Sequence, residues 1–396
     1  MRSSDAPSRV AIARRAAEIE PFEVMEVMSR AHALEAAGRR VIHMEIGEPD
    51  FTAPQPVVEA GVRALREGRT AYTPALGLPA LREAIAEHYA RRFGVEVPAS
   101  RIAVTAGASG ALLLALALHV QRGAQMLVPD PGYPGYRHFV RAFEGRTQPL
   151  PVDPHSRFQP TFERVEHAWT TSTVGLLLGS PGNPSGTVLP GRELERIALH
   201  VAHRKALLVV DEIYQGLVYG REPFTALGLP GDVILVNSFS KYFCMTGWRL
   251  GWAVLPQASV RSFEKLAQHL YICAPAAAQH AALAAFLPET TQILEERRRE
   301  FERRRDFIVP ALERAGLAVP AKPDGAFYVY ADCSRFGVDS RRFALELLET
   351  QGVAVTPGTD FGSYNGGRYV RLAYTRGMQD LEEGARRIAR FCGTLA

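Results

Sequence analysis

The chain of 396 residues contains very little lysine. Lysine and arginine together number 46, and only four of these are lysines, so the other 42 are arginines. Arginine can carry positive charge on a surface, but its pKa is too high for it to act as a nucleophilic amine. Chemistry that needs an amine must therefore use one of four side chains: Lys205, Lys241, Lys265 and Lys322.

Long apolar runs are also missing. The longest candidates, Ala111–Val120 and Cys273–Leu287, are shorter than 18 residues, which is too short for a helix that crosses a bilayer. We therefore expect no membrane partner. The first twenty residues contain arginines and acidic residues without a following apolar segment, so we expect no secretory signal either.

Cysteine is scarce as well, and the cysteines lie far apart without CxxC spacing: Cys244, Cys273, Cys333 and Cys392. This pattern favours neither a disulfide framework nor a zinc site, and we expect a reducing, cytoplasmic location. His200 and His203 have the spacing of a metal pair on a helix, but no third ligand accompanies them. We interpret them as a surface pair and predict no metal site.

Charge of one sign is nowhere concentrated, although the net charge is +4. The densest charged run, Glu295–Asp306, alternates acidic and basic residues at helical spacing. Such alternation is typical of a solvated helix face, whereas nucleic-acid binding would need a basic patch. We therefore expect no nucleic-acid partner.

The middle of the chain has the pattern of an α/β fold. At roughly 150 residues per domain, the length suggests two or three domains. Short apolar runs alternate with segments of helical spacing such as Ala108–Val120 and Arg192–Arg204, which is typical of a mostly parallel sheet covered on both faces. The predicted strands are Ile102–Thr105, Gln125–Val128, Val174–Leu178, Leu207–Asp211, Val233–Asn237 and Leu250–Leu255.

The two ends of the chain have a different pattern. Residues 20–38 form a helical stretch without a partner strand, and a long charged helix after residue 285 runs to about Arg314. We predict a smaller α+β domain built from residues 1–50 and 286–396 around a large domain of residues 51–285. The last segment would alternate strands and helices at Phe327–Ala331, Ser340–Gln351, Tyr369–Ala373 and Asp380–Cys392.

Polar and small residues follow the first predicted strands. In an open parallel sheet, ligands bind at the carboxyl ends of the strands. Ala108, Ser109 and Gly110 open a helix after the first strand, where backbone N–H groups make an anion site, although small residues also serve simply to start helices. Turns after the next two strands present Tyr133 and Asn183, and plain turn chemistry is the alternative for each.

Charged residues follow the later strands. Asp211 closes an apolar strand, with Tyr214 three residues on, and a buried acid needs a cation or a strong donor. Lys241 lies just past the next strand, where burial would lower its pKa and make it a nucleophile for carbonyls. Serine hydroxyls and an arginine fork beside it suit a phosphate: Ser238, Ser240 and Arg249. An amine, a phosphate cradle, a carboxylate and an aromatic face are together what pyridoxal 5′-phosphate (PLP) requires.

Eight segments also resemble one known family. In order along the chain they are IGEPDF, AYTPALGLPALREAIA, PDPGYPGY, SPGNPSGT, DEIYQGLVY, SFSKYFCMTGWRLGW, PDGAFYVY and YVRLAYT. With these segments the chain resembles the class I/II aminotransferases, the PLP-dependent enzymes of fold type I. The resemblance implies a large α/β domain with a mostly parallel sheet, a smaller α+β domain from both termini, and PLP as the cofactor.

The resemblance also implies a role for each matching residue. Lys241 would form the Schiff base with PLP and act as the base for the proton shift. Asp211 would pair with the pyridine nitrogen, while Asn183 and Tyr214 would hydrogen-bond the 3-oxygen of the ring. The implied catalytic residues are thus Lys241, Asp211 and Tyr214. Tyr133 would stack on the ring, and the phosphate would be held by Ser238, Ser240, Arg249 and the backbone of Ala108, Ser109 and Gly110.

Further residues would bind the substrate or join two subunits. Arg371 would hold the substrate α-carboxylate in a bidentate pair, assisted by Asn183 and the backbone around Gly47. Tyr72 resembles the tyrosine that reaches the phosphate from the neighbouring subunit, which implies a homodimer with shared sites. Taken alone, Arg371 fits a structural ion pair equally well, and Tyr72 fits ordinary packing.

The implied reaction is the ping-pong transfer of an α-amino group from an L-amino acid to a 2-oxo acid. A PLP-dependent β-lyase or decarboxylase of the same fold is the alternative, because it needs the same lysine and aspartate. A transcription regulator with such a domain would need a DNA-binding module. Only about 20 residues precede the resemblance, so we do not expect one.

The amino donor stays open at this stage. A dicarboxylate donor would need a second cation for its distal carboxylate, and 42 arginines do not single one out. Trp248, Tyr271 and the region of Phe22 and Met25 would either line an apolar side-chain pocket or belong to the core.

Overall fold

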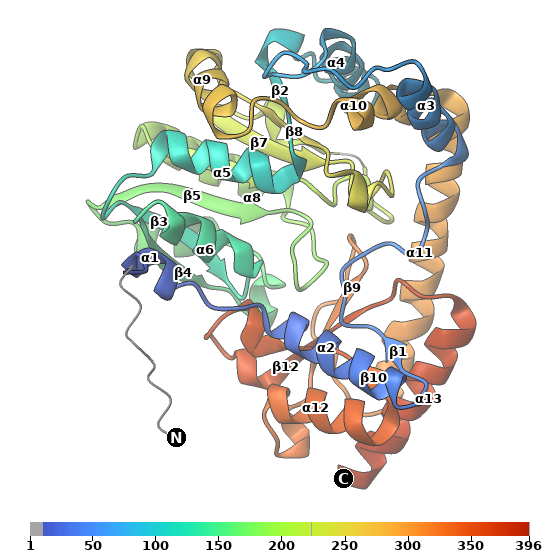
Figure 1. Cartoon of the computed structure of the whole chain (residues 1–396). Helices are drawn as coiled ribbons and strands as arrows, with labels where there is room; N and C mark the ends of the chain where they lie inside the picture. Colours follow the sequence, from blue (N-terminus) through green and yellow to red (C-terminus); the bar gives the residue numbers. More distant parts are fainter. Residues whose placement is uncertain (1–10, 223, 396) are drawn as a thin grey trace, which may run out of the picture.

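A seven-stranded sheet forms the centre of the protein in the computed structural model, which describes residues 11–222 and 224–395. Its strand order is β2-β8-β7-β6-β5-β3-β4 (Figure 1). All six strands predicted for the middle of the chain are confirmed, and β4 is an addition. The strands are β2 (Ile102–Thr105), β3 (Gln125–Asp130), β4 (Arg146–Pro151), β5 (Thr173–Gly179), β6 (Leu207–Asp211), β7 (Val233–Ser238) and β8 (Gly251–Val254).

Most neighbours in this sheet are parallel, as the sequence predicts. Strands β4, β3, β5, β6 and β7 pair in parallel, whereas β8 lies antiparallel between β7 and β2. Strand β6 is apolar throughout because it is covered on both faces. Leu208 and Val210 pack into one core cluster, and Leu207 and Val209 pack into the other.

Helices form a layer on each face of the sheet (Figure 1). One layer contains α5 (Gly107–His119), α6 (Pro134–Ala142) and α9 (Val260–Leu270), and the short α1 (Arg14–Ala17) contacts α6. The other contains α4 (Pro79–Phe93), α7 (Phe162–Ala168) and α8 (Gly191–His203). Helices α3 (Gln55–Arg66) and α10 (Ala276–Ala282) pack against each other at the top of Figure 1.

Segments from both ends of the chain form the lower part of the molecule in Figure 1. Strand β1 (Ile42–His43) pairs in parallel with β10 (Val353–Ala354), and β11, β12 and β9 form a second, antiparallel sheet. These contacts support our proposal of a smaller unit from residues 1–50 and 286–396, of which residues 1–10 lie outside the described residues. Its other elements are α2 (Glu23–Ala36), β9 (Tyr328–Asp332), α12 (Ser340–Gln351), β11 (Thr356–Pro357), β12 (Tyr369–Ala373) and α13 (Met378–Leu395).

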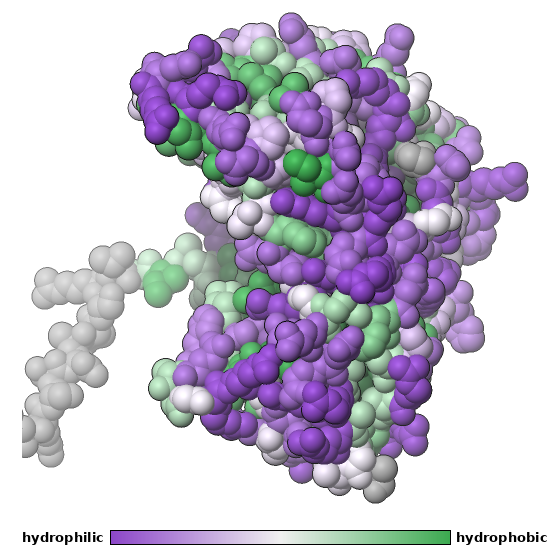
Figure 2. All heavy atoms as spheres, turned by 90° about the vertical axis from the view of Figure 1, so that its right-hand side faces the viewer, coloured by the Kyte–Doolittle hydropathy of each residue, from purple (hydrophilic) through white to green (hydrophobic). Residues whose placement is uncertain are grey.

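The long helix α11 (Pro288–Arg314) connects the two parts, because it contacts α3 above and α13 and β9 below (Figure 1). The side of the molecule that carries it is mostly hydrophilic (Figure 2). The prediction of a fully solvated face is nevertheless wrong for two arginines of the charged run. Arg304, only 4% exposed, pairs with Asp50, and Arg305, 7% exposed, lies over the ring of Tyr219. These arginines are buried because each finds an acid or an aromatic face.

Three smaller expectations concern the membrane, the cysteines and the histidine pair. Within residues 11–222 and 224–395, no helix is both long and apolar enough to cross a membrane. The four cysteines are free thiols. The ring of His200 packs edge-on against Phe162 and Trp169, so aromatic packing accounts for this residue.

Candidate active site

A cavity of about 500 Å³ lies between the carboxyl ends of the central strands and the lower part of the molecule. Two predicted site residues do not line it. Gly110 lies in the first turn of α5 without reaching the cavity, and Tyr72 is 81% exposed in the loop between α3 and α4. The predicted residues that do line it are Gly47, Ala108, Ser109, Tyr133, Asn183, Asp211, Tyr214, Ser238, Ser240, Lys241, Arg249 and Arg371.

Lys241 projects into this cavity from the loop after β7. Its Nζ donates a hydrogen bond to the carbonyl oxygen of Gly47 at 2.6 Å. Burial lowers the pKa of Lys241 from its usual value to about 8, and the positive charges of Arg371 and Arg249 act in the same direction. A substantial fraction of this amine is therefore uncharged at neutral to slightly alkaline pH, as a nucleophile or a base requires.

Asp211 closes strand β6 and is buried. Its carboxylate accepts hydrogen bonds from the hydroxyl of Tyr136 at 2.8 Å and from the N–H of Ile213 at 3.0 Å. Burial raises the pKa of Asp211 to about 6, and these hydrogen bonds and the charge of Lys241 oppose the rise. The carboxylate therefore stays ionised at pH 7 and offers a fixed negative charge inside the cavity.

An anion site lies at the start of α5. Gly107 begins this helix with φ +73°, and a Cβ there would lie 2.7 Å from Nη2 of Arg249, so the guanidinium lies directly against the first turn. The N–H of Ser240 donates to Oγ of Ser238 at 3.0 Å, and the two hydroxyls are 2.9 Å apart. Helix N–H groups, a guanidinium and two hydroxyls together suit a phosphate.

Arg371 lies on β12 at the opposite side of the cavity and is 5% exposed. Its Nη1 donates to Oδ1 of Asn183 at 3.0 Å, and its Nη2 donates to the carbonyl oxygen of Glu45. The guanidinium carbon lies 4.4 Å from the ring centre of Tyr328 and 4.8 Å from that of Phe361. These contacts fix the orientation of the planar guanidinium, whose fork matches the geometry of a carboxylate.

Tyr214 and Gly47 both contact Tyr328. The hydroxyls of Tyr214 and Tyr328 are 2.7 Å apart, and burial raises the pKa of Tyr214 well above its usual value. A Cβ at Gly47 would lie only 1.9 Å from the hydroxyl oxygen of Tyr328. Glycine is therefore needed at this position for the loop to pass close to both Lys241 and Tyr328.

A third side of the cavity is apolar and comes from α2 and the loop after β1. Phe22, Val24, Met25, Met28 and Ile46 line it. The sequence predicts the region of Phe22 and Met25 as a candidate for a side-chain pocket, and both residues line this side. Trp248 and Tyr271, the other two candidates, are not among the described residues that line the cavity, and both pack against the core clusters instead.

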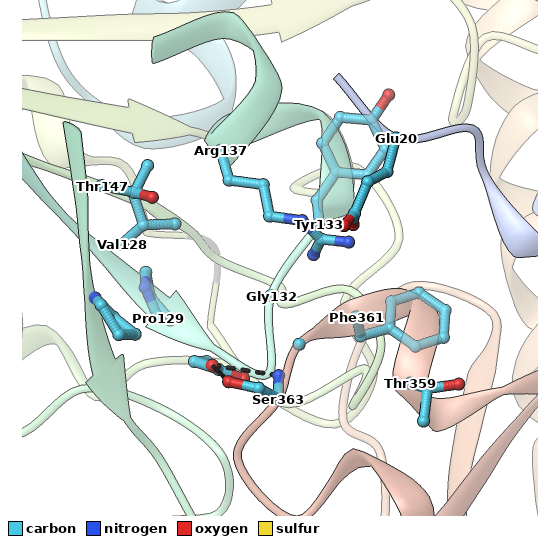
Figure 3. Close-up of a pocket in the computed structure, with 13 residues that line it drawn as sticks. Glu20, Val128, Pro129, Gly132, Tyr133, Arg137, Thr147, Thr359, Phe361 and Ser363 are labelled. Carbon is cyan, nitrogen blue, oxygen red and sulfur yellow. Dashed lines mark hydrogen bonds between the residues drawn. The ribbon is translucent and has the colours of Figure 1, made fainter. Parts of the chain in front are cut away.

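A second pocket of about 430 Å³ is drawn in Figure 3. Tyr133 and Phe361 line both this pocket and the cavity, so the two are neighbours. Tyr133 also stacks on Phe22, with ring centres 6.3 Å apart. Arg137 points into the second pocket, and its Nη2 donates to the carbonyl oxygen of Asp360 at 2.9 Å.

The sequence does not predict several residues that line or support the cavity. Tyr136, Tyr328 and Phe361 hold the predicted residues in place, and the first two lie in quoted motifs, PDPGYPGY and PDGAFYVY. The sequence assigns a role only to Tyr133 in the first motif and to no residue in the second, so neither tyrosine is predicted. Glu48 and Asp360 also line the cavity, and no strand-end pattern points to Asp360.

Comparison with known proteins supports the same conclusion. A sequence profile described as aminotransferase class I and II matches residues 39–388. The chain belongs to this family. The valine–pyruvate aminotransferase of Mycobacterium tuberculosis is 38% identical over 374 residues, which cover 94% of this chain and 96% of that protein. The aspartate/prephenate aminotransferase of Thermus thermophilus is 35% identical over 385 residues, which cover 96% and 99%.

Solved structures agree with the fold of this aminotransferase. An aminotransferase from Mycobacterium tuberculosis superimposes with a TM-score of 0.93 at 37% identity, over 97% of this chain and all of that one. The aspartate aminotransferase of Thermus thermophilus with maleate gives a TM-score of 0.91 at 35% identity, over 96% and 100%. The predicted fold, that of the fold type I aminotransferases, is confirmed.

The residues of the cavity fit PLP, the cofactor that this family typically uses. The anion site at α5 suits its phosphate, Asp211 suits a protonated ring nitrogen, and the amine of Lys241 suits its aldehyde. One buried atom also lacks a protein partner, because Nε of Arg371 makes no hydrogen bond to any described residue. A buried N–H group without a partner is costly, and an anionic ligand such as a substrate carboxylate would accept a hydrogen bond from it.

Proposed function

We propose that this aminotransferase uses PLP to move an α-amino group from an L-amino acid to a 2-oxo acid in two half-reactions at one site. The observation that carries the proposal is the placement of Lys241. Its amine, with a pKa lowered to about 8 by burial, lies in one cavity with the anion site at α5 and the fork of Arg371.

The cofactor would be held at three points. Arg249, Ser238, Ser240 and the start of α5 would bind its phosphate, with Tyr133 against the ring and Asn183 and Tyr214 near the 3-oxygen. When bound, PLP supplies an aldehyde for the substrate amine and a ring that withdraws electrons. The Asp211 carboxylate would keep a proton on the ring nitrogen, because an ionised acid in a buried site stabilises a cation.

The protein's own groups would perform the remaining work. Arg371 would bind the α-carboxylate of the donor and then that of the acceptor, and this contact would orient Cα towards Lys241. The Nζ of Lys241 would accept the proton that leaves Cα of the donor. In the second half-reaction it would supply a proton to Cα of the acceptor. The carbonyl oxygen of Gly47, which accepts a hydrogen bond from Nζ, would hold the amine of Lys241 in the cavity when it is not bonded to the cofactor.

Assembly and location belong to the same proposal. Tyr72 is 81% exposed, which supports a homodimer in which this residue reaches the phosphate of the neighbouring site. Four free cysteines support a cytoplasmic location, where thiols stay reduced.

Absorbance tests the proposal directly. The purified protein should absorb in the visible range, and an amino donor alone should convert this band to that of pyridoxamine phosphate, with one equivalent of 2-oxo acid released. A 2-oxo acid should then restore the first band. Release of ammonia from a donor without any acceptor would instead indicate a β-lyase, and release of carbon dioxide a decarboxylase. A protein that stays colourless with added PLP would refute the proposal.

A further inference from the structure

The charges around the cavity disfavour a second carboxylate on the donor. Among the described lining residues, the basic side chains are Lys241, Arg249 and Arg371, and the proposed function uses all three. Glu48 and Asp360 also line the cavity. Within the described part of this chain, a distal carboxylate would therefore meet two like charges and no unassigned cation that lines the cavity, which disfavours binding.

Arg137 does not change this balance. It lines the second pocket (Figure 3), which shares only Tyr133 and Phe361 with the cavity, and it is not among the described residues that line the cavity. Its Nη2 donates to the carbonyl oxygen of Asp360.

The side of the cavity to which the proposed function assigns no role is apolar. Phe22 directly precedes α2, Val24, Met25 and Met28 lie in its first two turns, and Ile46 lies in the loop after β1. Met25 is 51% exposed, although it faces a cavity rather than a flat surface. Methionine adapts its shape to irregular apolar groups, so a ligand side chain that covers Met25 would bury apolar surface on both partners.

One short segment holds this apolar wall in place. The 3₁₀ turn η8 (Gly358–Phe361) supplies Asp360, whose Oδ1 accepts a hydrogen bond from the N–H of Glu23 at 2.9 Å. The residue before α2 provides no side-chain cap of its own, so Asp360 satisfies the first turn of the helix from a distant part of the chain. Thr359 adds a bond from its hydroxyl to Oε2 of Glu23 at 2.8 Å.

The same turn contacts the carboxylate clamp. Phe361, next to Asp360, stacks on the guanidinium of Arg371. The apolar wall and Arg371 therefore contact the same short turn. This shared contact links the site for a donor's α-carboxylate to the site for its side chain.

We propose that the amino donor carries an apolar, uncharged side chain, which binds against Phe22, Met25 and Met28, and that Asp360 is the positioning residue of this wall. The proposal rests on the proposed function for the reaction but not for the binding. Donors with branched, thioether or aromatic side chains fit it, and aspartate and glutamate do not.

The first test compares donors in the half-reaction of the holoenzyme. We expect kcat/KM for valine, leucine, methionine or phenylalanine to exceed that for aspartate and glutamate by at least about 100-fold. Equal or higher values for the acidic donors would overturn the inference. If no amino acid reacts, the proposed function fails instead, and the binding test below decides the inference alone.

The second test measures binding without turnover. In calorimetry with the holoenzyme, 4-methylpentanoate should bind at least about 10-fold more tightly than succinate, since only the former has an apolar tail. Succinate binding as tightly as 4-methylpentanoate would overturn the proposal even if the enzyme were inactive.

Variants locate the effect on α2. Met25→Arg should lower kcat/KM for leucine about 10-fold and raise that for aspartate, because it places a cation on the wall. Asp360→Ala should raise KM for apolar donors about 10-fold with little change in kcat, and Asp360→Asn, which keeps the acceptor oxygen, should restore KM. Ser29→Ala, on the exposed side of the same helix, is the matched control. An unchanged KM in Asp360→Ala, or a change as large in Ser29→Ala, would refute the positioning role.

Discussion

The two walls of the cavity are built in different ways. The cofactor wall is the side proposed to hold PLP. Its residues Asp211, Ser238 and Lys241 lie at or just beyond the ends of β6 and β7, so neighbouring strands fix them. The substrate wall is the side proposed to bind the donor, with Arg371, Asp360 and the start of α2. Single hydrogen bonds there join segments far apart in the chain. Glu23 and Asp360 are 337 residues apart, and Asn183 and Arg371 are 188 residues apart.

Because of this difference, we expect the rate of the reaction to depend on the cofactor wall and the choice of donor to depend on the substrate wall. A strand within a sheet is held by hydrogen bonds on both sides, and one altered side chain rarely moves it. The substrate wall depends on a few side-chain contacts, so one substitution there can change its shape while the cofactor wall stays intact. Changes on the cofactor wall should therefore lower kcat for all donors alike, and changes on the substrate wall should act through KM.

The largest effect is expected for Lys241→Ala, on the cofactor wall. Loss of the amine should lower kcat by at least about 10⁴-fold for every donor, because both the nucleophile and the proton carrier are removed. Single-turnover absorbance measures this directly. Lys265→Ala, which removes an exposed lysine on α9, should leave kcat unchanged. Activity of Lys241→Ala within tenfold of the parent would contradict the assignment.

A smaller loss is expected for Asp211→Asn on the same wall. Asparagine keeps the shape and the bond from Tyr136, but it removes the negative charge that would hold a proton on the ring nitrogen. We expect kcat to fall about 10³-fold for apolar and other donors alike. A loss confined to one donor would break the comparison, because it would place donor choice on the cofactor wall.

The substrate wall is tested by Arg371→Lys. Lysine keeps the positive charge but loses the fork that binds a carboxylate through two nitrogens. We expect kcat/KM to fall about 100-fold, mostly through KM, while the absorbance of bound cofactor stays the same. If kcat fell and KM did not, Arg371 would belong functionally to the cofactor wall.

The smallest effect concerns stability and lies outside both walls. His88 on α4 packs among Phe93, Phe243 and Phe286, and burial lowers its pKa to about 3. As the pH falls, the unfolded chain, whose histidine has a pKa near 6.5, takes up a proton before the folded protein does. Neutral His88 therefore contributes to the free energy of unfolding above pH 6.5, and this contribution is lost as the pH falls below that value. Between pH 7 and pH 5 the loss amounts to about 2 kcal/mol.

Urea unfolding at the two pH values measures this loss. In His88→Gln the difference between pH 7 and pH 5 should shrink by about that amount, whatever the absolute stability of the variant. An unchanged difference would show that His88 is not the responsible group. The donor preference should be the same in both proteins, since α4 contributes to neither wall.

The sequence was sufficient for most of the sheet and for the strand-end groups that the structure brings to one cavity. Apolar runs ended within two residues of the observed bounds of β6 and β7, and the groups placed at their ends, such as Asp211 and Lys241, line one cavity. Strand β4 was missed because Arg146–Pro151 is polar and contains two prolines, which suits an edge strand and hides the usual pattern.

The substrate wall was harder to predict for a physical reason. The helix around residues 20–38 was expected, but its partner was not, because a bond such as that from Glu23 to Asp360 leaves no local pattern. Tyr136 was missed although it lies three residues from Tyr133, since no spacing rule shows that its hydroxyl reaches Asp211.

The pairing of the two chain ends also sets the order in which the protein can be completed during synthesis. The carbonyl oxygen of Glu45 accepts a hydrogen bond from Thr356, 311 residues later. At about 5 to 20 residues per second, a ribosome needs about 15 to 60 s for that interval. Throughout it, α2 and β1 have been synthesised without their partners. The clamp of Arg371 can be completed only after residue 371 has been added, whereas Asp211, Ser238 and Lys241 all precede residue 250.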